Sequence, residues 1–360
     1  MFDVLSFDPF TLFDDGFGPA EVGVSRRHVA QAFVVTLVVS GTVTGEGDDA
    51  ISLLGGGSVV NSGRIQGVAG VQADGVQIQF ASDQGTDDAP KQSGTITNLA
   101  GGEIFGARYG AIIAGSGTVE NAGLIEGGLT GLLIVDQART GTVGSLINTG
   151  NIVGGVLMDV DSGSAYNSGS ITSSTGAAFT SVQAITLING GRIAGGAGAA
   201  VQFGGGDDVL LLTTGSQIEG IVDGGLGLDT ATLDADATSV LDLGPFINFE
   251  RLEVEGGTWL ANGTTGSFDA IDVLDGRLVV TGSLAGNLTT NGAGIFEIGN
   301  GGTSGSFTGN LQNDGAFVFN RSDNFDFEGD FAGTGLFTKL GTGTIAFLGD
   351  YADVDVQHSS

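Results

Sequence analysis

Apolar and small polar residues alternate in short runs along most of the chain, and each run borders a corner rich in glycine and asparagine. The equivalent aliphatic positions of eight such runs are Val43, Ile65, Ile104, Ile125, Ile152, Ile171, Ile193 and Ile218. They recur about every 25 residues, within the period of roughly 20 to 50 residues that is typical of solenoids and other repeat folds. The chain is therefore predicted to repeat one small structural unit.

A second apolar element lies between these runs, as in DGVQI (74–78), GAIIA (110–114) and GLLIV (131–135). Each repeat is thus expected to hold about two short strands. Such strands cannot bury an apolar side alone, but successive coils can pair their backbones edge to edge. The pattern predicts an all-β protein, a single-stranded parallel β-helix (solenoid) of about 13 to 15 coils. Helices are disfavoured because 68 of the 360 residues are glycine.

The corners share the motif Asn-x-Gly, which indicates a structural role. Glycine adopts positive φ without steric cost, and asparagine tolerates the left-handed region while its amide bonds to neighbouring backbone. Stacked corners are expected to form ladders of asparagine side chains. The residues assigned to these turns are Asn61, Gly63, Asn98, Asn121, Gly123, Asn148, Gly150, Asn167, Gly169, Asn189 and Gly191.

The period also indicates how the chain is organised. The step from Ile65 to Ile104 is 39 residues long, and the polar residues 81–92 are predicted to form a surface loop within it. Beyond residue 245 phenylalanine becomes frequent at coil spacing, which predicts a stacked aromatic core. The predicted parts are an N-terminal extension or cap (1–28), a β-helix of Asn-x-Gly coils (29–245), C-terminal β-helix coils (246–352) and a tail (353–360).

Charge and composition exclude several classes of function. Asp and Glu number 41 against 11 Lys and Arg, and the formal net charge of -30 repels phosphate backbones, so no nucleic-acid partner is expected. Without cysteine the chain has no disulfide and no thiol nucleophile. Its most apolar run, 29–39, is shorter than the ~20 residues of a membrane-spanning helix. The two histidines, His28 and His358, flank the repeats, so a Ser-His-Asp triad is not expected.

The last coils resemble a known family. Residues 313–351 (NDGAFVFNRSDNFDFEGDFAGTGLFTKLGTGTIAFLGDY) closely resemble the strand repeat near the end of bacterial autotransporter (type V secretion) passengers, and residues 247–264 (INFERLEVEGGTWLANGT) look like the segment before it. The Asn-x-Gly coils are similar to the rest of such a passenger.

This resemblance implies a right-handed β-helix outside a Gram-negative cell, secreted or held at the outer-membrane surface, with residues about 247–351 as the stable end that nucleates folding. The implied partners are a host or cell-surface receptor, a glycan or a second copy of the chain. The family's C-terminal membrane barrel is not recognisable here. The expectation is thus a passenger segment: a fragment or frameshift of a longer autotransporter, or a passenger-only protein.

Three aspartates are candidate calcium ligands, Asp207, Asp208 and Asp229. The segment GGLGLDTATL (224–233) matches the nonapeptide of calcium-binding β-rolls, in which aspartate and backbone carbonyls bind the ion. Asp208 and Asp229 are a coil period apart, not nine residues, which favours solvated turn carboxylates instead. No other cofactor is expected.

The phrase GDDAI (47–51), with ADGV (73–76) downstream, is similar to polygalacturonase-type glycoside hydrolases, whose β-helix carries paired aspartates for acid and base catalysis. The other elements of that family are missing, and GDDVLLL (206–212) repeats the wording, which favours a structural turn. The prediction is a non-enzymatic protein without catalytic residues, and the alternatives are a polysaccharide-cleaving enzyme (a lyase or glycoside hydrolase) and a calcium-binding, β-roll-like protein. A cluster of two or three carboxylates with Arg or Lys beside Asp48 and Asp49 would favour that alternative.

Overall fold

The computed structural model describes residues 4–6, 36–68, 70, 73–79, 93–136, 141–263, 266–352 and 355–357. Over these residues the regular structure is β-strand, paired in parallel as a β-solenoid of about 13 turns, which confirms the predicted fold class. The right-handed sense of winding stays a prediction. The predicted loop at 81–92, most of the extension at 1–28 and most of the tail at 353–360 lie outside the described residues.

Two compact units divide the chain. The first comprises residues 1–187, 191–204 and 217–220, and the second comprises 188–190, 205–216 and 221–360. The strands β20 (Ile185–Asn189) and β23 (Gln217–Asp223) therefore have residues in both. In the described part of either unit, no helix is long and apolar enough to cross a bilayer.

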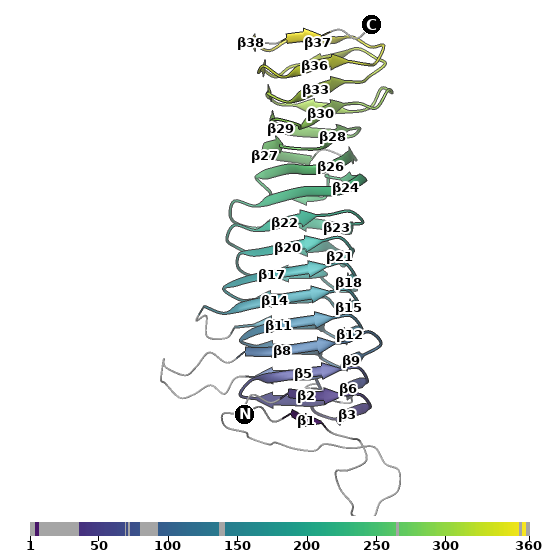
Figure 1. Cartoon of the computed structure of the whole chain (residues 1–360), viewed down its shortest axis with the longest axis vertical. Coiled ribbons are helices and arrows are strands. Elements are labelled where there is room, and N and C mark those ends of the chain that lie inside the picture. Colours follow the sequence, from purple (N-terminus) through teal and green to yellow (C-terminus); the bar gives the residue numbers. More distant parts are fainter. Residues whose placement is uncertain are drawn as a thin grey trace, which may run out of the picture. The chain divides into compact units, whose positions relative to one another are not determined.

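Each complete coil of the first unit has three strands, one on each of three faces, instead of the two expected. Figure 1 labels the strands of two of these faces. The sequence predicts one strand where there are two because the Asn-x-Gly-x-Ile motif runs across a corner: Asn121 ends one strand and Ile125 lies in the next. The first face holds β2 (Thr36–Val39), β5 (Gly57–Asn61), β8 (Ser93–Asn98), β11 (Ser116–Asn121), β14 (Val143–Asn148) and β17 (Ser162–Asn167), and β1 (Val4–Ser6) pairs with β2. The second holds β3 (Thr42–Glu46), β6 (Arg64–Val68), β9 (Glu103–Gly106), β12 (Leu124–Gly127), β15 (Asn151–Val153) and β18 (Ser170–Thr172). The third holds β4 (Ile51–Leu54), β7 (Val76–Gln79), β10 (Tyr109–Ala114), β13 (Thr130–Val135), β16 (Val156–Asp159) and β19 (Phe179–Ser181), and β21 (Arg192–Gln202) extends the second and third faces.

Equivalent apolar side chains stack from coil to coil in the core of this unit. A column on the second face is in register and wholly buried, and it consists of Ile65, Ile104, Ile125, Ile152, Ile171 and Ile193. Burial of each such side chain contributes roughly 1.5 to 3 kcal/mol. Because Ile65 pairs directly with Ile104, the 39-residue step is a single coil with extra residues.

Glycine is needed at the corners for a different reason from the expected positive φ. The five assigned corner glycines all lack positive φ, and so do the asparagines, since Asn248 is the one described non-glycine residue with it. A Cβ on Gly123 would instead lie 2.1 Å from the carbonyl oxygen of Gly102 in the preceding coil. The same overlap, at 2.0 to 2.2 Å, would occur at Gly63, Gly150, Gly169 and Gly191. The corners require glycine because successive coils approach too closely there for a side chain.

The second unit is also built of parallel strands in successive coils. One column runs through β22 (Val209–Leu212), β24 (Thr230–Asp242), β26 (Arg251–Asn262), β27 (Gly266–Val273), β29 (Ser283–Thr290), β32 (Leu311–Asn313), β35 (Phe331–Ala332) and β38 (Tyr351–Ala352). A second runs from β24 and β26 through β28 (Arg277–Val280), β30 (Ile295–Ile298), β33 (Ala316–Phe319), β36 (Leu336–Lys339) and β39 (Asp355–Gln357). Shorter strands are β25 (Phe246–Ile247), paired with β23, β31 (Ser306–Thr308), paired with β29, and the pair β34 (Phe325–Phe327) and β37 (Ile345–Phe347).

Phenylalanine rings fill the core of these coils, as predicted. Phe296, Phe317 and Phe337 occupy one register position in β30, β33 and β36, and their stacked ring centroids are 5.7 and 5.2 Å apart. Further rings, those of Phe307, Phe327, Phe331 and Phe347, pack against this column. The aromatic column supplies the apolar burial that binds each coil to the next.

Candidate functional site

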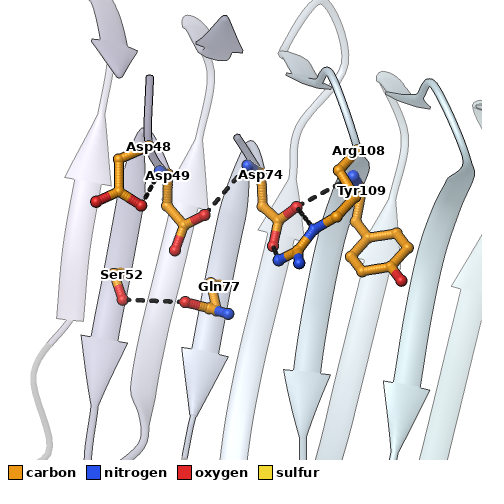
Figure 2. Close-up of polar contacts among 7 residues, drawn as sticks. All are labelled: Asp48, Asp49, Ser52, Asp74, Gln77, Arg108 and Tyr109. Carbon is orange, nitrogen blue, oxygen red and sulfur yellow. Dashed lines mark hydrogen bonds and ion pairs between the residues drawn. The ribbon is translucent and has the colours of Figure 1, made fainter. Parts of the chain in front are cut away.

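The corner that leads into the third face of the first unit carries a cluster of charged side chains. Asp49, Asp74 and Tyr109 occupy the same position in three successive coils, just before β4 and β7 and at the start of β10. The backbone amide of Asp74 donates to Asp49 Oδ1 at 3.1 Å, and that of Tyr109 donates to Asp74 Oδ1 at 3.1 Å (Figure 2). Each carboxylate thus caps an amide of the following coil.

Asp74 forms a bidentate ion pair with Arg108, the residue before β10. Arg108 Nε donates to Asp74 Oδ1 at 2.9 Å and Nη2 to Oδ2 at 2.5 Å, and the guanidinium lies 4.7 Å from the centre of the Tyr109 ring. The Asp74 side chain is wholly buried, whereas that of Arg108 is 21% exposed. These hydrogen bonds raise the pKa of Arg108. A bidentate fork on a buried carboxylate fixes both groups, so Asp74 is engaged and shielded from a ligand.

The pKa of the Asp49 carboxyl is raised. Burial raises the pKa of Asp49 to about 6, and the charges of Asp74 and Asp48 add to the rise, while the Asp74 amide and Arg108 oppose it. Asp48 is exposed, and its Oδ1 accepts from the Asp49 amide at 3.0 Å. A carboxyl that titrates near neutrality beside a second carboxyl can donate and accept protons, as general acid and base catalysis requires.

The sequence pointed to Asp48 and Asp49 but missed the ion pair of Asp74 with Arg108. The available signal was positional, because each of Asp49, Asp74 and Arg108 stands one or two residues before a third-face strand. The insertion between β7 and β8 puts Arg108 34 residues after Asp74, which hides their common place in the coil.

The raised pKa predicts a pH dependence of stability. The folded state holds the Asp49 proton more tightly than the unfolded chain does, so the stability this proton contributes is fully present below pH 3.8 and lost as the pH rises through about 6. Asp49→Asn keeps an oxygen for the Asp74 amide and carries no charge. It is expected to gain stability relative to the native protein as the pH rises across this window. Urea unfolding at a series of pH values measures the difference, with the exposed Glu120→Gln as control; a difference independent of pH contradicts the assignment.

The capping of an amide by a carboxylate from a neighbouring coil recurs elsewhere. Further examples are the Thr142 amide with Asp161, the Leu228 amide with Asp207, the Thr334 amide with Asp314 and the Asp350 amide with Asp330. The contact itself is therefore a structural feature of these corners. The cluster at Asp49 differs because it also contains the ion pair of Asp74 with Arg108 and a carboxyl, that of Asp49, whose pKa is raised.

The calcium candidates lie in the second unit. The expectation that they are solvated turn carboxylates is wrong for two of them. Asp207 is exposed, but Asp208 and Asp229 are wholly buried at the same position in adjacent coils. The Asp208 amide donates to Asp229 Oδ1 at 2.8 Å. Among the described residues no group of three or more acidic or histidine side chains is arranged to hold a metal ion.

The corner asparagines form a hydrogen-bonded ladder in the first unit. The Nδ2 of each donates to Oδ1 of the next at 2.7 to 2.8 Å, in the order Asn61, Asn98, Asn121, Asn148 and Asn167. Asn189 belongs to the second unit and donates to Ser216 Oγ at 2.7 Å. Outside the ladder, an open groove follows the corner over four coils and is lined by Gly102, Gly123, Gly150 and Gly169.

No protein-family model matches the chain, and no curated protein or solved structure matches it either. The resemblance of residues 313–351 to an autotransporter passenger therefore stays a prediction.

Proposed function

We propose that the chain is a non-enzymatic, passenger-like solenoid segment, displayed outside a Gram-negative cell, that offers an acidic surface for adhesion, aggregation or spacing. The observation that carries the proposal is the repetition of the same internal contacts from coil to coil. The asparagine ladder links five coils, and the phenylalanine column links three. A chain whose buried side chains mainly extend the stack is suited to holding a repetitive surface.

Two further features support this proposal. Residues 313–351, which resemble the passenger strand repeat, supply Phe317, Phe327, Phe331 and Phe337 to the aromatic core, so this segment has the packing expected of a stable end. The net charge of -30 keeps copies apart at low ionic strength, and salt screens that repulsion.

Display and association can be tested separately. Antibodies raised against the purified chain are expected to label intact cells of the bacterium that encodes it, and brief protease treatment of the cells should remove the signal. Sedimentation velocity of the purified chain is expected to show larger species as salt increases, because repulsion falls. Labelling only after permeabilisation contradicts display, and a monomer at every salt concentration that also binds no glycan on an array contradicts adhesion and aggregation.

A second candidate function is acid and base cleavage of a polysaccharide, and the cluster around Asp49 favours it. A cluster of carboxylates with an arginine or lysine at this corner is the feature that favours an enzyme, and Asp49, Asp74 and Arg108 form one. The two carboxylates that a substrate can approach are Asp48, which is exposed, and Asp49, whose pKa lies near neutrality. In this function Asp49 would protonate the leaving oxygen and Asp48 would act as the base.

Release of reducing ends from a panel of neutral and acidic polysaccharides tests this second function. If Asp49→Asn and Asp48→Asn each abolish the release while Glu120→Gln retains it, the enzyme replaces the non-enzymatic proposal. If the native chain releases no sugar from the panel, the second function fails for those substrates and the cluster is a coil cap.

A further inference from the structure

A column of acidic residues precedes three strands of the second unit. Asp208, Asp229 and Glu250 stand directly before β22, β24 and β26, at one register position in successive coils. The Asp208 amide donates to Asp229 Oδ1 at 2.8 Å, and the Asp229 amide donates to Glu250 Oε2 at 2.7 Å. Backbone amides thus satisfy one oxygen of Asp229 and one of Glu250.

The other oxygen of Asp229 is the anomaly in this column. The residue is wholly buried, and its Oδ2 has no hydrogen-bond donor among the described residues. A buried carboxylate oxygen is normally paired, because removing it from water without compensation costs several kcal/mol. This oxygen therefore lacks the partner that its burial requires.

The charges around Asp229 are all of the same sign. Burial raises the pKa of Asp229, and the carboxylates of Glu250, Asp207 and Asp223 raise it further. The nearest arginine in the sequence, Arg251, is paired with Glu253 and Asp272 at 2.9 Å each. The site holds an excess of negative charge that a cation would neutralise.

Backbone of two coils lies close beside this carboxylate. A Cβ on Gly224 would lie 2.0 Å from the carbonyl oxygen of Asn248 and 3.0 Å from the Cβ of Asp229, so only glycine allows the backbone to approach Asp229 this closely. The segment between them is exposed at Leu226 and Leu228 and has positive φ at Gly225 and Gly227. A glycine-rich, exposed segment can adjust its carbonyl groups around an ion.

We propose that Asp229 Oδ2 binds a calcium ion, with one neighbouring carboxylate, backbone carbonyls of the 224–228 segment and water completing the coordination. Calcium fits better than magnesium because it accepts irregular sets of oxygen ligands, including backbone carbonyls, whereas magnesium requires a near-ideal octahedron. Few side-chain ligands are required, in keeping with the absence of three convergent acidic groups among the described residues. This site is independent of the proposed surface function.

Calcium dependence of unfolding tests the site in the full chain. Trp259 in β26 is the single tryptophan and is buried in the second unit, so its fluorescence reports on unfolding there. At calcium about a hundred-fold above its dissociation constant, the unfolding equilibrium constant is expected to fall about a hundred-fold relative to chelator. Magnesium at equal ionic strength should have a much smaller effect. Asp229→Asn should remove the calcium effect, and Asp236→Asn, an exposed acidic residue of the same strand β24, should retain it.

Several outcomes would overturn the proposal. These are equal unfolding in calcium and chelator, equal effects of magnesium and calcium, or an unchanged calcium effect in Asp229→Asn. Calcium-insensitive native protein together with a more stable Asp229→Asn at neutral pH would identify a proton, not a metal, as the neutralising species. Should Asp229→Asn not fold, calorimetric titration of the native chain and Asp207→Asn with calcium alone decides the question: the variant must bind several-fold more weakly, and Asp236→Asn equally well.

Discussion

Replacing Phe317 with alanine is expected to lower the free energy of unfolding of the second unit by about 3 to 5 kcal/mol. The side chain is wholly buried and contacts four other rings, those of Phe296, Phe327, Phe331 and Phe337. Truncation removes its apolar burial and leaves a cavity between coils that the stacked backbone cannot close. Urea unfolding followed by Trp259 fluorescence measures the loss.

Two variants calibrate this result. Phe317→Leu keeps most of the apolar volume and should lose markedly less stability than Phe317→Ala. Leu340→Ala removes a side chain that is 55% exposed and should change stability by no more than about 0.5 kcal/mol. If Phe317→Ala is no worse than Leu340→Ala, the aromatic column is not what holds these coils together.

Breaking the asparagine ladder at its centre is expected to cost about 2 to 3 kcal/mol in the first unit. Asn121 accepts from Asn98 Nδ2 at 2.8 Å and donates to Asn148 Oδ1 at 2.8 Å and to the Asn151 carbonyl at 3.1 Å. In Asn121→Ala the buried Oδ1 of Asn148 loses the donor that Asn121 supplies. Hydrogen exchange of peptides from β11 and β14 should accelerate, because the coils separate more easily.

The neighbouring residue supplies the control for the ladder. Glu120 is exposed and precedes Asn121 in β11, so Glu120→Ala should leave exchange in β11 and β14 nearly unchanged. Asn121→Asp retains the shape but cannot donate, and it adds a charge among buried amides. It should be the most damaging of the three at neutral pH. Equal exchange in Asn121→Ala and Glu120→Ala would mean that backbone pairing alone stabilises the corner.

The sequence predicts several residues of the candidate sites but not the contacts that these residues make. Asp48 and Asp49 were predicted from the similarity of GDDAI (47–51) to polygalacturonase-type hydrolases, and the three calcium candidates from the match of GGLGLDTATL (224–233) to the β-roll nonapeptide. The contacts that give these residues their properties were not found. Asp74 meets Arg108 because the two stand at nearly equivalent positions of adjacent coils, although an insertion separates them by 34 residues, and Asp229 is buried although Leu226 and Leu228 beside it are exposed. The local sequence identifies a turn but does not specify which of its side chains points inward.

The sequence by itself determined the parallel solenoid, its coil period and the stacking of the Ile and Phe columns. These follow from repetition, because any residue that recurs once per coil must lie against its own equivalent. The tertiary structure alone decided that a first-unit coil has three strands and that the carbonyl of Gly102 leaves no space for a side chain at position 123. It also decided that Asp229 Oδ2 is buried with no donor in the part of the chain that the structure describes. Each of these depends on contacts between coils at distances of a few ångströms, which the spacing of residues along one chain does not specify.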